Sequence, residues 1–252
     1  QKYGKPCFLD EHLERLFTSA SGISLKIPFS ENEIKNQIQR TLDSVENSES
    51  YIRIIVTRGV GEVDIDPSYC FKPNIIILVK DLPQIPDEKY SNGISVSLVS
   101  IKRNSRDSLN PAIKTGNYLN NILARVEASK MGAEDAIMMN SWGQLTEATT
   151  SNLFFVVDGQ LLTPEKKCGI LSGITREKII HLANENGMVL EEGIWPGEEL
   201  SKADEIFLSG TVKNIMPVSI LDNRPVGNGK PGPITLKMMG LYSRLLEKFN
   251  QG

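Results

Sequence analysis

Apolar residues recur at two different spacings along the chain, and the spacing separates helices from strands. In the stretch "DEHLERLFTSASGI" (10–23) leucine and phenylalanine return at i, i+3 and i+4, which is the spacing of an amphipathic helix. A second helix is predicted over 30–45, which opens at Ser30 with a Ser-x-x-Glu capping signature. Runs rich in β-branched residues and bounded by Gly, Pro and Asp predict strands over 51–57, 74–80 and 94–101.

Strands and helices then alternate to the end of the chain. The predicted helices cover 117–131, about 175–187 and 234–249, and the predicted strands cover 136–140, 204–210 and 214–220. Asp158-Gly159 between two apolar runs predicts a hairpin turn. In the helix that Gly132 closes, we expect a buried stripe made of Tyr118, Leu119, Ile122, Leu123 and Val126. The pattern predicts an α+β fold with antiparallel strand pairing.

A polar stretch with two prolines, "DLPQIPDEKYSNG" (81–93), divides this pattern. We predict a small N-terminal α/β domain over 1–82, an interdomain linker over 83–92 and a larger mixed-sheet domain over 93–252. The chain opens at Gln1 and enters its first predicted helix almost at once, so we expect N-terminal strands to be missing from this sequence.

Composition excludes several classes of function. The chain has 252 residues, 40% of them hydrophobic, and a formal net charge of −3 with both signs interleaved. We therefore expect a soluble globular protein that binds neither nucleic acid nor membrane. The apolar runs are too short to span a bilayer, and three cysteines without metal-ligand spacing disfavour a disulfide scaffold or a metal site. The predicted location is the cytoplasm.

Lys114 is a candidate nucleophile. It lies just before a predicted helix in "NPAIKTGNYLNNILA" (110–124). The positive end of a helix dipole and partial loss of water both disfavour the charged form of an amine, so the amine becomes usable in Schiff-base chemistry. Taken alone, the position equally fits a solvated surface lysine.

Two further stretches fit an anion, and one residue fits a cationic ring. In "ILSGITREK" (170–178) free backbone N–H groups at a helix start would cup a phosphate, although simple helix capping explains the same pattern. The turn Gly210-Thr211-Val212 after a strand can aim N–H groups at an anion, or be an ordinary turn. Glu147 could pair with a protonated ring nitrogen, or be an exposed strand charge. An amine, a carboxylate and two anion cups in this order are the parts of a pyridoxal phosphate site.

The chain resembles the fold type IV pyridoxal-phosphate enzymes, the class IV aminotransferases, over nearly its whole length. The resemblance is carried by the stretches "EHLERLFTSA", "YIRIIVTRGVG", "IKTGNYLNNILARVEASKMGAEDAIMMN", "LTEATTSNLFFV", "GITREKII" and "DEIFLSGTVKNIMPV". It implies a two-domain fold whose larger domain is a mixed sheet or pseudo-barrel. It also implies pyridoxal 5'-phosphate as the cofactor and an assembly of at least a homodimer.

The resemblance also implies roles for individual residues. Lys114 would be the Schiff-base lysine and proton shuttle, and Glu147 would keep the pyridine nitrogen protonated. The expected cofactor-binding set is Arg15, Lys114, Tyr118, Glu147, Ile174, Thr175, Gly210 and Thr211. The expected substrate-binding set is Tyr51, Arg53, Thr211 and Val212.

Within the family, "YIRIIVTRGVGEVDIDP" is most similar to the branched-chain aminotransferases, whose partners are amino acids and 2-oxo acids. We therefore expect amino transfer between leucine, isoleucine or valine and 2-oxoglutarate. Val212 and Lys213 stand where many such enzymes carry two small residues, so the pocket is expected to be narrower or differently charged. A D-amino-acid aminotransferase, an aminodeoxychorismate lyase and a cofactor-binding pseudoenzyme remain as alternatives.

Overall fold

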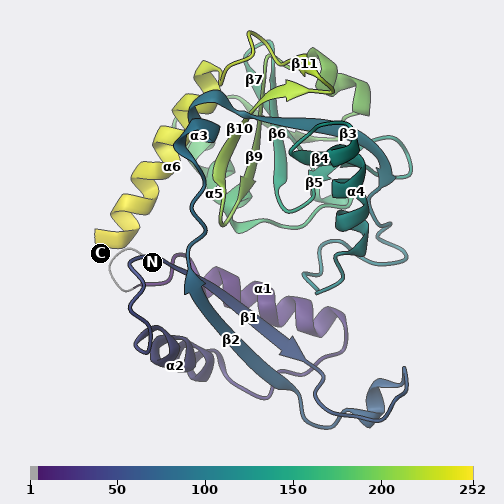
Figure 1. Cartoon of the computed structure of the whole chain (residues 1–252), viewed down its shortest axis with the longest axis vertical. Coiled ribbons are helices and arrows are strands. Elements are labelled where there is room, and N and C mark those ends of the chain that lie inside the picture. Colours follow the sequence, from purple (N-terminus) through teal and green to yellow (C-terminus); the bar gives the residue numbers. More distant parts are fainter. Residues whose placement is uncertain (1–4, 252) are drawn as a thin grey trace. The chain divides into compact units, whose positions relative to one another are not determined.

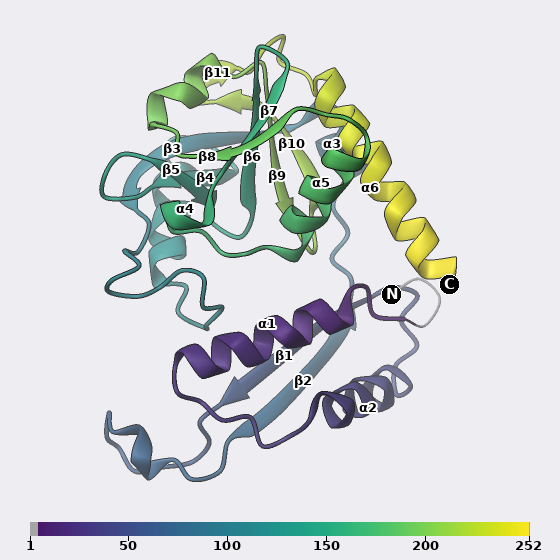
Figure 2. The ribbon, with the colours of Figure 1, turned by 180° about the vertical axis from the view of Figure 1, so that it is seen from behind.

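The computed structural model describes residues 5–251 and separates into two compact units. Of the described residues, the small unit contains 5–84 and 249–251, and the large unit contains 85–248 (Figures 1 and 2). The outermost residues of the two predicted domains, 1–4 and 252, lie outside the described part of the chain. In that part, no helix combines the length and the apolar character that a membrane span needs.

In the small unit, two helices cover one face of a two-stranded antiparallel ribbon. Its elements are α1 (Leu9–Gly22), α2 (Glu31–Leu42), β1 (Ser50–Thr57), a short 3-10 turn (Pro67–Tyr69) and β2 (Asn74–Asp81). The core joins Leu13, Ile34, Ile38 and Leu42 from the helices to Ile52, Ile54, Ile75, Ile77 and Val79 from the strands. Alternate strand residues face the helices, as period two requires.

The capping signature at α2 is confirmed. The Ser30 hydroxyl accepts from the Glu33 backbone N–H at 3.3 Å, and Glu33 Oε2 accepts from the Ser30 backbone N–H at 2.7 Å. These two reciprocal bonds occupy backbone donors that the helix itself leaves without partners. The predicted helix ran to residue 45, but α2 ends at Leu42.

The large unit is a nine-stranded mixed sheet with helices around it. Its helices are α3 (Asp87–Asn92), α4 (Leu119–Lys130), α5 (Ile174–Glu185) and most of α6 (Pro233–Gln251), with 3-10 turns at Lys166–Cys168 and Gly197–Lys202. Its strands are β3 (Ile94–Lys102), β4 (Asp135–Met139), β5 (Leu145–Ala148), β6 (Asn152–Val157), β7 (Gln160–Pro164), β8 (Leu190–Gly193), β9 (Glu205–Gly210), β10 (Asn214–Leu221) and β11 (Arg224–Pro225).

Six of these strands close into a ring. The hydrogen-bonded order runs β10-β3-β4-β5-β6, and β9 pairs with both β6 and β10. The prediction of antiparallel pairing was incomplete, because β3 pairs in parallel with β4 and with β10, and β7 pairs in parallel with β8. The chain crosses over through α4 between β3 and β4 and through α5 between β7 and β8. Such crossovers are needed because a hairpin cannot connect parallel neighbours.

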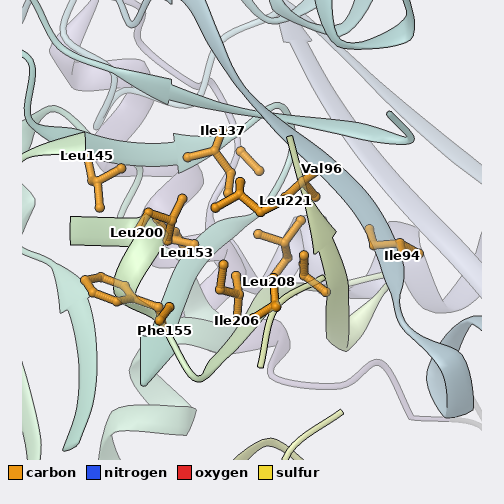
Figure 3. Packing of buried hydrophobic residues seen from close by; sticks show 14 of the residues in the cluster. Ile94, Val96, Ile137, Leu145, Leu153, Phe155, Leu200, Ile206, Leu208 and Leu221 are labelled. Atoms are coloured by element: carbon orange, nitrogen blue, oxygen red, sulfur yellow. The ribbon is translucent and has the colours of Figure 1, made fainter. Parts of the chain in front are cut away.

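The ring encloses the main hydrophobic core, part of which Figure 3 shows in close-up. Ile137, Leu153, Phe155, Ile206 and Leu208 come from three different strands and are 0–1% exposed. The predicted Asp158-Gly159 turn is confirmed between β6 and β7. Both residues have positive φ, 50° and 78°, as the common two-residue hairpin turn requires.

The buried face of α4 differs from the prediction. Leu119, Ile122, Leu123 and Val126 are 64%, 55%, 47% and 45% exposed. The helix instead turns Asn121, Ala124 and Ala128 inward, and the two alanines pack with Val99, Ala133, Ala136 and Met138. The small alanine side chains let the helix lie close to the sheet. Because the exposed face of α4 also carries apolar residues, and larger ones, hydrophobic periodicity alone selects the exposed face as the buried face.

A short helix lies inside the predicted linker over 83–92. The division between the units falls after Gln84, and α3 occupies the second half of the stretch. Ile85 and Tyr90 pack against the main core of the large unit. Two apolar side chains therefore anchor a segment whose polar composition indicated an irregular connection.

Candidate active site

The centre of the site is a buried carboxylate on β5. Glu147 is 5% exposed, and both of its oxygens accept hydrogen bonds. Arg103, just after β3, directs Nε and Nη2 at Glu147 Oε1, each at 3.0 Å. Asn152 Nδ2 and the Leu171 backbone N–H donate to Oε2 at 3.1 and 3.0 Å. This fork-shaped contact with two further donors is what a buried carboxylate needs to remain ionised.

Opposing effects set the charge of Glu147. Burial is the largest and raises the pKa of the carboxyl above its ordinary value, while the Arg103 guanidinium, the Leu171 N–H and the Lys114 ammonium act to lower it. Arg103 is itself held by Asn120 in the first turn of α4, whose Oδ1 accepts from Arg103 Nη1 at 3.2 Å. The alternative of an exposed strand charge at Glu147 is therefore wrong.

Lys114 lies in an irregular segment ahead of α4. Its side chain is exposed, and Nζ donates to the Tyr118 hydroxyl at 3.4 Å. Asn120 fastens the two ends of this segment together, because its Nδ2 donates to the Lys102 carbonyl at 2.8 Å. The amine is close enough to influence Glu147 electrostatically. The structure thus places the predicted amine and the predicted carboxylate in one neighbourhood.

The N-terminus of α5 adjoins the same carboxylate. Gly173 is the N-cap, and among the described residues no side chain caps this helix, which leaves the backbone donors of Ile174 and Thr175 without a capping partner of that kind. Asn152 joins this region to Glu147, since its Nδ2 also donates to the Leu171 carbonyl at 2.9 Å. A Cβ on Gly173 would lie 2.0 Å from Asn152 Oδ1, so only glycine fits there.

The turn between β9 and β10 lies beside these groups. Ser209 is the register partner of Asn152, and Gly210 is the next residue along β9. Thr211 is exposed and Val212 is half-buried at the turn. Asn152, at the start of β6, therefore contacts the carboxylate and the α5 N-terminus while it pairs with the strand that leads into the turn.

Arg103, Asn152 and Leu171 were missed by the sequence analysis. Asn152 stands in "TTSNLFF" beside a predicted strand, where a polar residue ahead of an apolar run was a usable signal. Arg103 lies 44 positions from Glu147 and gave no such signal. Only the pairing of β3, β4 and β5 brings these two residues together.

Three predicted residues, Arg15, Tyr51 and Arg53, belong to the small unit. Arg15 lies on α1, with Nη2 3.4 Å from His12 Nδ1. Tyr51 and Arg53 share the face of the ribbon opposite the helices, where their register partners are Lys80 and Leu78. Their roles remain predictions.

Known proteins match this chain in both sequence and fold. Residues 2–221 match the sequence profile of the family described as "Amino-transferase class IV". The chain belongs to the class IV aminotransferases. A branched-chain-amino-acid aminotransferase of Pseudomonas aeruginosa is 35% identical over 94% of this chain and 78% of its own length.

Solved structures of class IV aminotransferases share the fold. The branched-chain amino acid aminotransferase of Escherichia coli superimposes with a TM-score of 0.88 at 31% identity, covering 92% of this chain and 77% of that one. The enzyme of Thermobaculum terrenum, in its pyridoxal-phosphate form, gives a TM-score of 0.84 at 31% identity over 94% of this chain and 77% of that one. These matches confirm the predicted fold type IV, and with it the α+β class.

The side chains of this chain fit pyridoxal phosphate, the cofactor that class IV aminotransferases use. Glu147 offers an anion to a protonated ring nitrogen, and Lys114 offers a primary amine to an aldehyde. The start of α5, with a glycine N-cap, offers N–H groups to a phosphate. Each of the three chemical groups of the cofactor therefore has a partner of the right type in the large unit.

Proposed function

We propose that the chain transfers an amino group between a branched-chain L-amino acid, namely leucine, isoleucine or valine, and 2-oxoglutarate. The observation that carries the proposal is the buried Glu147 carboxylate, clamped by Arg103 and Asn152 within electrostatic range of Lys114. The names of its relatives support the choice of substrate. Pyridoxal phosphate, when bound, supplies a ring that withdraws electrons from the substrate Cα.

The proposed roles in the large unit follow from charge and position. Glu147 would keep a proton at the ring nitrogen of the bound cofactor, since the Arg103 guanidinium favours the ionised form of this carboxyl. Lys114 would hold the cofactor through Nζ, and once the substrate amino group had displaced this Nζ, the freed amine would take the proton from the substrate Cα as a general base. Tyr118 would flank the bound cofactor, and its hydroxyl would orient Lys114 Nζ across the 3.4 Å contact. The N–H groups of Ile174 and Thr175 bind the phosphate.

The turn and the small unit complete the proposal. Gly210 and Thr211 contribute to phosphate binding, and Thr211 and Val212 bind the substrate carboxylate. Arg15 is proposed as a further phosphate ligand. Tyr51 and Arg53 would line the substrate pocket, and the same ribbon face carries exposed apolar side chains at Ile76 and Leu78, suited to a branched aliphatic group.

A substrate panel tests this function. Purified enzyme with pyridoxal phosphate is expected to transaminate L-leucine with 2-oxoglutarate, and to be at least about tenfold slower with D-alanine or aminodeoxychorismate. Borohydride reduction followed by peptide mapping is expected to find the cofactor on Lys114. Lys114→Ala should lower kcat by at least about a thousandfold, whereas Lys130→Ala, an exposed lysine at the end of α4, should leave it unchanged.

Other outcomes of the panel would replace the proposal. Preference for D-alanine indicates a D-amino-acid aminotransferase, and pyruvate release from aminodeoxychorismate indicates the lyase. A cofactor-loaded protein inactive on all three substrates would be a pseudoenzyme. A label on another residue would overturn the role of Lys114.

We also propose that the enzyme forms at least a homodimer and works in the cytoplasm. The exposed apolar side chains of α4, which include Leu119 and Ile122, support an interface, because such patches usually mark contact surfaces. The free thiols of Cys70 and Cys168 fit a reducing compartment. A monomeric sedimentation coefficient at micromolar concentration would contradict the dimer, and secretion of the native protein would contradict the location.

A further inference from the structure

The hairpin turn between β9 and β10 ends in a lysine whose charge is already paired. Lys213 Nζ lies 2.6 Å from Asp135 Oδ2, and the two side chains are 27% and 3% exposed. Asp135 is the first residue of β4, far from the turn in sequence. The sequence suggested that Lys213 would change the charge of the pocket, but the structure directs its ammonium to a buried carboxylate.

Asp135 also holds a second turn. Its Oδ1 accepts from the Thr149 hydroxyl at 2.5 Å, and from its neighbour's backbone N–H at Ala136. The Thr149 carbonyl accepts from Asn121 Nδ2 of α4 at 2.6 Å. Thr149 follows β5, two residues after Glu147. The Asp135 carboxylate therefore links the β9–β10 turn to the turn that follows β5, the strand that carries Glu147.

The backbone of Lys213 is fastened independently. Tyr90 of α3 donates from its hydroxyl to the Lys213 carbonyl at 3.2 Å. The next residue, Asn214, has a φ of 53°, a conformation that asparagine tolerates better than most residues. On the other side of the turn, Gly210 is the antiparallel register partner of Asn214, so this pair closes the hairpin. The three-residue turn over 211–213 is thus held at both ends.

The ion pair between Lys213 and Asp135 decides which groups of the β9–β10 turn can bind an anion. Removing the partner of a buried carboxylate is costly, so Asp135 keeps the Lys213 ammonium. Lys213 borders a cavity of about 510 Å³ that Arg125 and Tyr118 also line, but its charge is neutralised there. Backbone N–H groups of the turn remain as anion donors.

We propose that Lys213 is a positioning residue, which acts through Asp135 to hold the β9–β10 turn in the conformation that binds the substrate carboxylate. The proposal rests on the function proposed above for Thr211 and Val212. Lys213 does not itself contact the carboxylate. Asp135 also links the β9–β10 turn to the strand that carries Glu147, so this turn and Glu147 stay at a fixed distance from each other.

Binding of an unreactive substrate analogue tests the proposal. In the holoenzyme, Lys213→Met and Asp135→Asn should each raise the Kd of 4-methylvalerate about fivefold to tenfold, measured by calorimetry. The double variant should be no worse than the more affected single variant, because both changes break one contact. Lys213→Arg should restore most of the affinity. Lys202→Met, at an exposed pair with Glu199, is the matched control and should change nothing.

The variants separate positioning from direct contact. If Lys213 bound the carboxylate itself, Asp135→Asn would free its charge and tighten 4-methylvalerate binding, which would overturn the proposal. An unchanged Kd in Lys213→Met and in Asp135→Asn would overturn it as well. Should Lys213→Met fail to fold because Asp135 is left buried and unpaired, the neutral double variant still tests the turn.

Hydrogen–deuterium exchange tests the anchor without any ligand. Lys213→Met is expected to speed exchange of the amides of 211–214 about tenfold, with the strand amides unchanged. Unchanged exchange would overturn the inference even if the enzyme transaminates. If the wild-type protein does not bind 4-methylvalerate but Lys213→Met still exchanges faster, the proposed function of the turn is overturned. The role of Lys213 in holding the turn then stands.

Discussion

The two units bury their apolar side chains in different ways. In the small unit, a cluster of four buried residues lies between two helices and one face of a ribbon. In the large unit, a cluster of 16 buried residues is enclosed by a closed ring of strands and the segments around it. The large unit also buries charge, since Glu147 and Asp135 are 5% and 2% exposed.

This difference decides where charged side chains can be buried. Ionised groups inside a protein are tolerated only where donors are held in place, and a closed ring holds strands from distant parts of the sequence in register. The ribbon of the small unit leaves one face uncovered by its own helices, with Tyr51 and Arg53 on it. The small unit thus leaves polar side chains on an open face, whereas the large unit encloses its carboxylates among fixed donors.

The largest expected effect tests the buried charge. Arg103→Met leaves Glu147 buried without its guanidinium partner and should cost about 3–5 kcal/mol of unfolding free energy near neutral pH. Burial already raises the pKa of Glu147, and loss of Arg103 raises it further. The folded state then binds its proton more tightly than the unfolded state, so the deficit should grow as pH rises above the ordinary Glu value.

Urea denaturation at about pH 5 and about pH 8 measures this effect. Adding Glu147→Gln to Arg103→Met removes the buried charge and should recover much of the lost stability. Arg125→Met, at an exposed position on α4, is the matched control and should cost less than about 0.5 kcal/mol. An equal deficit at both pH values would show that Arg103 acts by packing rather than by charge.

A matched pair of cavity mutations tests whether the two cores are independent. Ile206 on β9 and Ile38 on α2 are each 1% exposed, and replacing either with alanine should cost its own core about 2–5 kcal/mol. Both tryptophans, Trp142 and Trp195, lie in the large unit, so their fluorescence reports on that unit alone.

Far-ultraviolet circular dichroism and tryptophan fluorescence should therefore report different transitions for only one of the two variants. Ile38→Ala should shift the far-ultraviolet circular dichroism transition while the tryptophan transition stays near that of wild type. Ile206→Ala should shift the tryptophan transition. If Ile38→Ala moves both transitions equally, the two units unfold together and their cores are not independent.

The smallest expected effect tests the capping box of the small unit. Ser30→Ala removes the side chain that accepts from the Glu33 N–H and should cost about 1 kcal/mol, visible by circular dichroism and not by tryptophan fluorescence. Ser44→Ala, just beyond the other end of α2, is the control, since its hydroxyl only donates to the Thr41 carbonyl. Equal losses in the two variants would contradict a specific role for the cap.

Local features could be predicted from the sequence because they depend on neighbours in the chain. The Ser30 cap, the Asp158-Gly159 turn and the bounds of most helices and strands follow from backbone preferences within a few residues. The chemical types of Lys114 and Glu147, in their order along the chain, were sufficient to suggest the cofactor.

Contacts between distant segments were decided only by the tertiary structure. The partners of Glu147 and Asp135, Arg103 and Lys213, lie 44 and 78 positions away in the sequence, and no local pattern connects them. The buried face of α4 was chosen by the sheet, which accepts its alanines and leaves its leucines outside. The physical reason is the same in each case: local sequence sets backbone preference, whereas burial and charge pairing depend on which strands the closed ring brings together.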